Sequence, residues 1–120
     1  MKILRAFLVI PLLLIANPAQ AALRAGARVV DATPTVLPVH VNGGMRQREL
    51  EEVGSRIKVR AILLDDGKTQ LAIVVVDSCM MSRAFLDGAK AAAQQKTGLR
   101  VDRMFISATH THSAPASMGC

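Results

Sequence analysis

The chain has 120 residues, with 15 Lys and Arg against 9 Asp and Glu, and it contains neither Trp nor Tyr. Its formal net charge is +6, and Lys2 and Arg5 contribute to it near the N-terminus, while the other positive charges are scattered along the sequence. Proteins that bind single-stranded nucleic acid use aromatic stacking platforms in a basic groove. The sequence shows neither feature, so it predicts a solvated charged surface and no nucleic-acid partner.

The N-terminus has the layout of a secretory signal peptide. Lys2 and Arg5 precede the uncharged apolar segment 6–16, and an Ala-x-Ala sequence ends at Ala21. The segment is shorter than the roughly 20 apolar residues that a membrane-spanning helix needs. We therefore expect a signal peptide, cleavage after Ala21, and secretion or export to a periplasm. The mature chain, 22–120, is expected to be a single domain without a transmembrane span.

The first part of the mature chain predicts one short strand and a long loop. The strand is expected at 28–32, and the loop covers 33–53, which is rich in Pro, Gly and polar residues. Loops of this length inside a compact domain tend to be functional or disordered. His40 can line a site from this loop, although a solvent-facing histidine is the commoner case. Backbone amides of Asn42-Gly43-Gly44 can approach a ligand closely, or the segment is a plain turn.

The middle of the chain predicts a hairpin. Residues 56–64 begin with strict alternation of polar and apolar side chains and end fully apolar, which is typical of a strand that enters the core. The sequence Asp-Asp-Gly-Lys at 65–68 is a turn signal. Residues 70–77 are apolar without alternation, which is typical of a strand covered on both faces.

A helix and a further strand follow. Ser82 is a favourable N-cap for a helix that runs to about Thr97, and Gly98 suits the left-handed residue that ends such a helix. The expected apolar stripe consists of Phe85, Leu86, Ala89, Ala92 and Ala93, while Lys90, Gln94 and Lys96 are expected to face water. Residues 103–108 predict a short strand, which a right-handed crossover places parallel to the preceding one. We expect an α/β fold, a partial mixed sheet with one hairpin and one strand–helix–strand crossover.

The segment Ile106-Ser-Ala-Thr-His-Thr-His-Ser-Ala-Pro115 begins within the last predicted strand and continues past it. Ligand sites of α/β sheets form at the carboxyl ends of strands. In extended backbone, His110 and His112 point to the same side, with α-carbons about 6.6 Å apart. Both rings can bind one metal ion, or one binds it while the other stands beside it near a substrate. Two surface histidines in a polar loop are the alternative, but the position at the sheet end favours a metal site.

Several hydrolase families carry a His-x-His motif. The metallo-β-lactamase pattern is excluded because Ala114-Pro115 stands in place of its Asp-His pair. An amidohydrolase remains possible, although there the motif follows the first strand of a (β/α)8 barrel. The string around the two histidines most resembles the signature of the neutral, non-lysosomal ceramidases. Upstream segments at 24–34, 42–45, 56–62 and 74–77 are similar to segments of that family in the same order.

The resemblance covers about 24–120 and implies the N-terminal part of the catalytic domain of a zinc-dependent amidase. Its implied substrate is a lipid-like N-acyl amide such as ceramide, which is hydrolysed to fatty acid and sphingosine. On the matching positions, His110 is the zinc ligand, His112 contacts the substrate or its oxyanion, and Asn42-Gly43-Gly44 lies in a loop that enters the site. Ala114 replaces a glycine of the family, which implies a bulkier loop and a substrate that differs from ceramide.

The same family takes its other zinc ligands, a His, a Glu and a Tyr, from far downstream. We therefore expect the remainder of the catalytic domain to be missing from this chain, which alone should be inactive. A non-catalytic exported module is the remaining alternative.

Two further residues have candidate roles. Cys79 and Cys120 have neither Cys-x-x-Cys nor zinc-ribbon spacing. Export permits a disulfide between them, but a buried, inert thiol is the preferred interpretation of Cys79. Asp77 ends a predicted core strand and can orient His110 as a carboxylate partner of a metal ligand, or it has a role in a turn.

Overall fold

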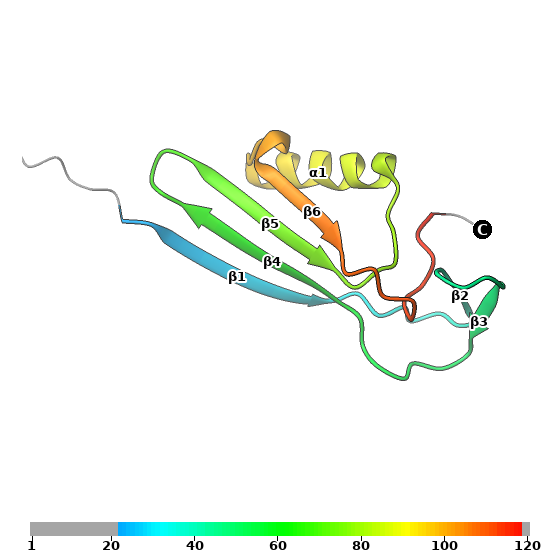
Figure 1. Ribbon diagram of the computed structural model, residues 1–120. Helices are drawn as coiled ribbons and strands as arrows, with labels where there is room; N and C mark the ends of the chain where they lie inside the picture. The colour runs from blue at the N-terminus through cyan, green and yellow to red at the C-terminus, as the bar shows by residue number, and fades with distance from the viewer. Residues whose placement is uncertain (1–21, 119–120) are drawn as a thin grey trace, which may run out of the picture.

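The computed structural model describes residues 22–118, so the predicted signal peptide and Cys120 lie outside the described residues. The elements follow in the order β1 (Arg24–Asp31), β2 (Val39–Val41), β3 (Arg48–Leu50), β4 (Lys58–Asp65), β5 (Gln70–Val76), α1 (Arg83–Thr97), a 3-10 turn η1 (Val101–Arg103) and β6 (Met104–Ala108) (Figure 1). A four-stranded sheet has the order β1-β4-β5-β6, and β2 and β3 form a separate antiparallel pair. The mixed sheet with a helix agrees with the expected α/β class.

The predicted hairpin is formed by β4 and β5, which pair in antiparallel register. One carboxylate oxygen of Asp66 accepts hydrogen bonds from the backbone amides of Lys68 (2.9 Å) and Thr69 (2.7 Å). Gly67 has a φ of 86°, a conformation that side chains disfavour. The turn residues therefore fix the register of the hairpin.

The predicted crossover is formed by β5, α1 and β6, and β6 pairs with β5 in parallel. The Ser82 hydroxyl accepts a hydrogen bond from Phe85 N at 3.2 Å, and Gly98, with a φ of 75°, donates its N–H to Gln94 O. Both predicted helix ends are confirmed. Figure 1 shows α1 running alongside β5 and β6. Among the described residues, no helix has the length and apolar character needed to cross a membrane.

The half-buried side of α1 differs from the predicted stripe. Leu86, Lys90 and Ala93 are half-buried, whereas Phe85 is 55% exposed. Positions three and four apart share one side of a helix, and a lysine can cover apolar surface with its methylene stem while its charge reaches water. Lys90, which was expected to face water, is therefore half-buried, while its ammonium group can still reach water.

The structure has more strand residues than predicted in two places. β1 begins at Arg24 rather than near residue 28, and its ladder with β4 runs from Arg24↔Asp65 to Asp31↔Lys58. The first residues of β1 lack apolar alternation, and an ion pair of 2.8 Å between Arg24 and Asp65 supports the pairing. The predicted loop 33–53 contains β2 and β3, which are only three residues each. Such short strands carry no recognisable period.

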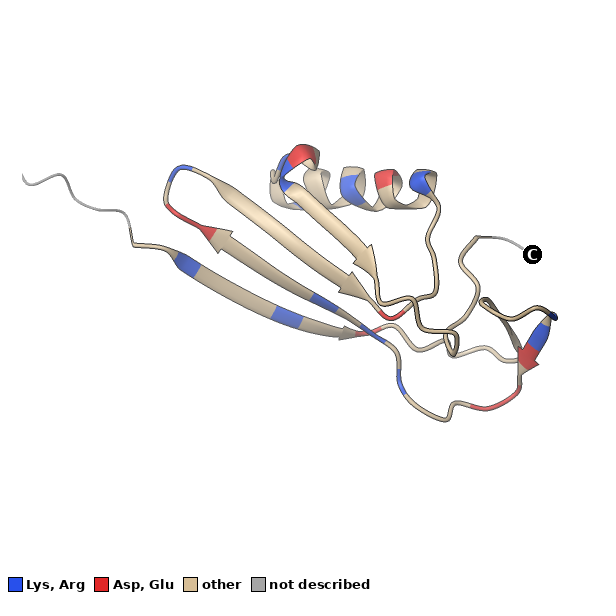
Figure 2. Cartoon of the chain, in the orientation of Figure 1, with Lys and Arg blue, Asp and Glu red and all other residues tan. Residues whose placement is uncertain are grey.

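The sheet has two unequal faces. Met104 is buried, while the next residue, Phe105, points to the opposite face and is 60% exposed. The register places Ile62 on the same face as Phe105, and Ile62 is also exposed. Figure 2 shows no charged residue on β5 or β6, while residues of both charges occur on α1. The described residues thus leave an apolar face open.

Candidate metal centre

The carboxyl ends of β5 and β6 are neighbours because the two strands are parallel. Residues 77–79 follow β5, and residues 109–117, the motif loop, follow β6. The amide of Thr109 donates to the carbonyl of Val76 at 2.9 Å, which ties the start of the motif loop to the end of β5. This pairing brings side chains from distant parts of the sequence together.

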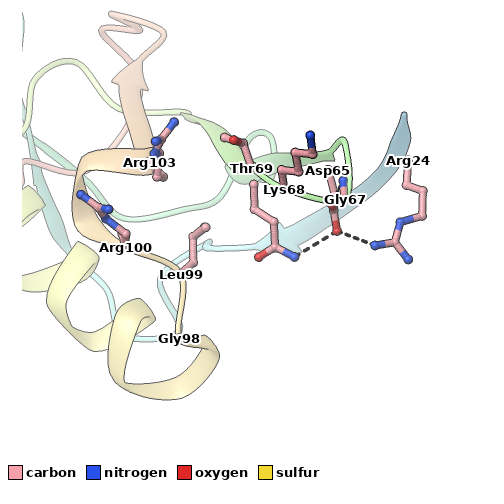
Figure 3. Close-up of a pocket in the computed structure, with 10 residues that line it drawn as sticks. Arg24, Asp65, Gly67, Lys68, Thr69, Gly98, Leu99, Arg100 and Arg103 are labelled. Atoms are coloured by element: carbon pink, nitrogen blue, oxygen red, sulfur yellow. Dashed lines mark hydrogen bonds and ion pairs between the residues drawn. The ribbon is translucent and has the colours of Figure 1, made fainter. Parts of the chain in front are cut away.

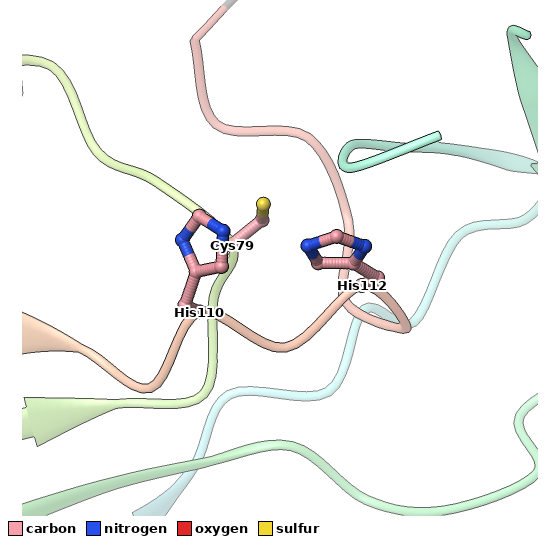
Figure 4. A group of neighbouring side chains, drawn as sticks. All are labelled: Cys79, His110 and His112. Atoms are coloured by element: carbon pink, nitrogen blue, oxygen red, sulfur yellow. The ribbon is translucent and has the colours of Figure 1, made fainter. Parts of the chain in front are cut away.

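Cys79, His110 and His112 form a cluster at this edge of the sheet. Their potential ligand atoms lie within 4.8 Å of one another, and the two ring centroids are 5.1 Å apart. Figure 4 shows the thiol directed between the two rings. Cys79 is buried, with 2% exposure, while both histidines are exposed. The cluster can hold a metal ion, with the sulfur on its inner side and the imidazoles toward solvent.

The backbone conformation that brings the two rings together differs from the prediction. β6 ends at Ala108, and His110 has a φ of 62°. Among the non-glycine residues of 22–118, it alone has a positive φ. The expected extended backbone was therefore wrong, because the chain turns at His110. A non-glycine residue in this conformation costs about 1–2 kcal/mol and persists where the surroundings fix it.

The small sheet holds the motif loop from the other side. Pro115 forms an isolated antiparallel bridge with Val41. Arg48 donates from Nη2 to the carbonyl of His112 at 2.9 Å. Ala114 is fully buried at 0% exposure. The loop that carries both histidines is thus packed between the ends of the main sheet and the β2–β3 pair.

The glycine loop predicted to enter the site does approach one histidine. A Cβ placed on Gly43 would lie 2.5 Å from Cγ of His112, and Gly43 has a φ of 95°. Any side chain at Gly43 would therefore displace the ring. An open pocket of about 560 Å³ is lined by Gly43, Gly44, Met45, Arg46, Gln47, Arg48 and His112. Asn42 lies beside this pocket without lining it.

His40, which could have lined the site, lies elsewhere. Its Nδ1 is 3.1 Å from Nε2 of Gln47 and 3.2 Å from a carboxylate oxygen of Glu49. These contacts join His40 to β3 and to the residue before it, and His40 does not join the cluster.

Asp77 does not orient His110. Its carboxylate accepts from Nη1 of Arg60 at 2.8 Å and from the amide of Lys58 at 2.9 Å. The Arg60 hydrogen bond is the main reason that the pKa of Asp77 lies below its ordinary value, and the Lys58 amide adds to it. Asp77 joins β4 to the end of β5, and of the two roles considered for it, the orientation of His110 does not occur in the structure.

Cys79 is the member of the cluster that sequence reasoning missed. Its predicted burial is confirmed, but its Sγ lies beside both imidazoles. Motif spacing could not show this, because only the parallel pairing of β5 with β6 brings Cys79 to the histidines. The available signal was its position just past a predicted core strand.

Two further pockets, each of about 390 Å³, contain no member of the cluster. One lies at the opposite end of the main sheet and is lined by Arg24, Asp65, Gly67, Lys68, Thr69, Gln70, Gly98, Leu99, Arg100 and Arg103 (Figure 3). The other adjoins the motif loop at Ser113 and Pro115, and its lining includes Leu37, Val39, Leu50 and Val53. A comparison with models of known protein families finds none that matches the chain.

Proposed function

We propose that this chain contributes the metal-binding edge of an exported, zinc-dependent amidase that hydrolyses a lipid-like N-acyl amide. The observation that carries the proposal is the cluster of Cys79, His110 and His112 at the carboxyl ends of two adjacent parallel strands. The resemblance of the motif to neutral ceramidases supports the reaction class. The location at the carboxyl end of the sheet independently supports a ligand site here, because α/β sheets bind ligands there.

The donor set suits zinc. Thiolate sulfur and imidazole nitrogen are its usual ligands, at about 2.3 Å and 2.0–2.1 Å. Tetrahedral geometry with these bond lengths separates neighbouring ligand atoms by about 3.3–3.6 Å. The ligand atoms of Cys79 and His110 lie within 4.8 Å of each other, so binding one metal ion needs a closure of at most about 1 Å. Side-chain rotation of the exposed His110 ring can supply this movement.

His110 and His112 have different proposed tasks. His110, beside the buried thiol, binds the metal. His112 belongs to the cluster and also lines the pocket, and it is held by Arg48 and by its contact with Gly43. When bound, zinc supplies a Lewis acid and lowers the pKa of water to about 7. The ring of His112 donates a hydrogen bond to the carbonyl oxygen of the amide, where negative charge grows in the transition state.

The surroundings of the motif loop fit an amphiphilic substrate. The pocket at His112 is lined by the charged side chains of Arg46 and Arg48. The pocket at Ser113 is lined by apolar side chains that include Leu37 and Leu50. An N-acyl amide has a polar end, to which the arginine side chains of the first pocket can donate hydrogen bonds, and an apolar chain, which the apolar side chains of the second pocket can contact.

The test compares zinc content and hydrolysis of a fluorogenic N-acyl amide in variants of the protein expressed from its complete gene. His110→Ala should lower both zinc content and turnover, because few side chains supply the metal affinity. His112→Ala should keep the zinc and lose turnover by about 10²–10³, the usual effect of removing one such donor. His40→Ala is the matched control and should keep both, since its ring contacts Gln47 and Glu49. Normal zinc and normal rates in both site variants would refute the proposal.

A further inference from the structure

We infer that Cys79 is a ligand of the same metal ion as His110, so that the centre combines a thiolate with an imidazole. The inference rests on one part of the proposed function, the binding of a metal at His110. It is independent of the substrate and of the reaction. Neither the His-x-His spacing nor the family resemblance assigns a role to Cys79.

Hydrogen bonds made by Ser78 hold the backbone around Cys79. Ser78 donates its amide to the carbonyl of Val76 at 2.9 Å, and its hydroxyl to the carbonyl of Met80 at 3.1 Å. These bonds hold the chain on both sides of Cys79. The sulfur therefore comes from a buried residue in a hydrogen-bonded segment of the chain.

His110 reaches Cys79 through an unfavourable backbone conformation. Its φ of 62° is one that non-glycine residues rarely adopt. The hydrogen bond from Thr109 to Val76 fixes the preceding residue. Within the described residues, no hydrogen bond orients the ring of His110 itself. A bond to a metal shared with Cys79 gives that orientation a physical cause.

Among the described residues of the cluster, the thiolate is the group that can carry a negative charge. The cluster contains no carboxylate among the described residues. Asp77, the nearest acidic residue in the sequence, is engaged by Arg60 and the amide of Lys58. Within this part of the chain, the sulfur of Cys79 is the group that can bring a negative charge to a divalent cation, and zinc binds thiolates well.

Cobalt substitution of the purified full chain tests the inference directly. Co²⁺ bound to a thiolate gives a charge-transfer absorption in the near ultraviolet, which imidazole ligands do not give. We expect this band in the wild type and in Cys120→Ser, the control for the other cysteine of the sequence. Cys79→Ser should abolish the band. It should also weaken zinc binding at least about tenfold, because loss of an outer partner alone costs 10- to 100-fold.

The outcomes separate this inference from the proposed function. If Cys79→Ser keeps the band or binds zinc as tightly as the wild type, the inference is wrong, while zinc loss in His110→Ala would still support the metal site. If the wild type takes up neither Co²⁺ nor Zn²⁺, both fail. Because Cys79 is buried, circular dichroism should confirm folding, and Cys79→Ala gives a second variant of similar size. His112→Ala should keep the band, since its ring stands beside the metal.

Discussion

At the scale of single residues, the close approach of Gly43 to His112 is the most restrictive contact of the site. Gly43→Ala would place a methyl group 2.5 Å from the ring and force a side-chain residue into a φ of 95°. We expect the free energy of unfolding to fall by at least about 1–2 kcal/mol, the cost of the backbone conformation alone. Urea denaturation followed by circular dichroism measures this change.

Gly54→Ala is the control for that variant, because a Cβ at Gly54 meets nothing within 4 Å. Its stability should stay within about 0.5 kcal/mol of the wild type. Equal stability of the two variants would contradict the close packing of Gly43 on His112. It would mean that the backbone at Gly43 does not hold the His112 ring in place.

The residues of the site were predictable to different degrees. His110 and His112 follow an apolar strand in a short motif, so a local pattern points to them. The glycine loop was identifiable from its composition and its resemblance to the ceramidase family, but its contact with His112 needed coordinates. Cys79 could not be assigned from local sequence, because parallel strand pairing alone brings it to the histidines.

At the scale of elements, the Asp77–Arg60 pair connects β4 with the end of β5, two residues before Cys79. The pKa of Asp77 is lowered in the folded chain, chiefly by the hydrogen bond from Arg60. The charged pair therefore stabilises the fold at pH values above the ordinary pKa of 3.8, and this contribution is lost as the pH falls below 3.8 through the lowered value. Asp77→Asn should be less stable than the wild type at neutral pH, and the difference should shrink in acid.

Denaturant titrations from neutral pH to about pH 2 follow this change across the titration of the carboxylate. Asp87→Asn on α1 is the comparison, because Asp87 pairs with Arg83 at the surface and is 53% exposed. Exposed pairs contribute little to stability, so its profile should run nearly parallel to that of the wild type. Identical pH profiles for the two variants would show that the Asp77–Arg60 pair does not anchor β4 to β5.

Elements were predictable where they are long or carry a cap. The β4–β5 hairpin has a turn sequence in which the Asp66 carboxylate accepts hydrogen bonds from the backbone amides of Lys68 and Thr69. Helix α1 has its cap residues at both ends. β2 and β3 were not predicted, because three residues are too few to show the polar–apolar alternation of a strand. The start of β1 was not predicted either, because its side chains do not alternate. Tertiary pairing rather than local preference forms these segments.

At the scale of the whole molecule, the described chain buries few apolar residues and exposes many. The buried apolar residues are Val41, Cys79, Met104 and Ala114. Phe105 and Ile62 are exposed on the face of the main sheet that lies opposite Met104. Small domains bury a low fraction of their surface and are marginally stable. We expect a low, broad thermal transition for residues 22–120.

The exposed sheet face also makes the chain prone to associate, because contiguous apolar patches favour contacts between molecules. Among the described residues, β6 is an edge strand of the main sheet, and such edges can pair with another chain. Phe105→Thr should reduce this association, since it removes a ring that is 60% exposed while keeping a residue that suits a strand. Sedimentation velocity over a range of concentrations should show a larger monomer fraction than in the wild type. Phe85→Thr on α1 removes a ring of similar exposure, 55%, away from that face, and should leave association nearly unchanged. Equal effects of the two substitutions would mean that total apolar exposure, rather than the open sheet face, controls association.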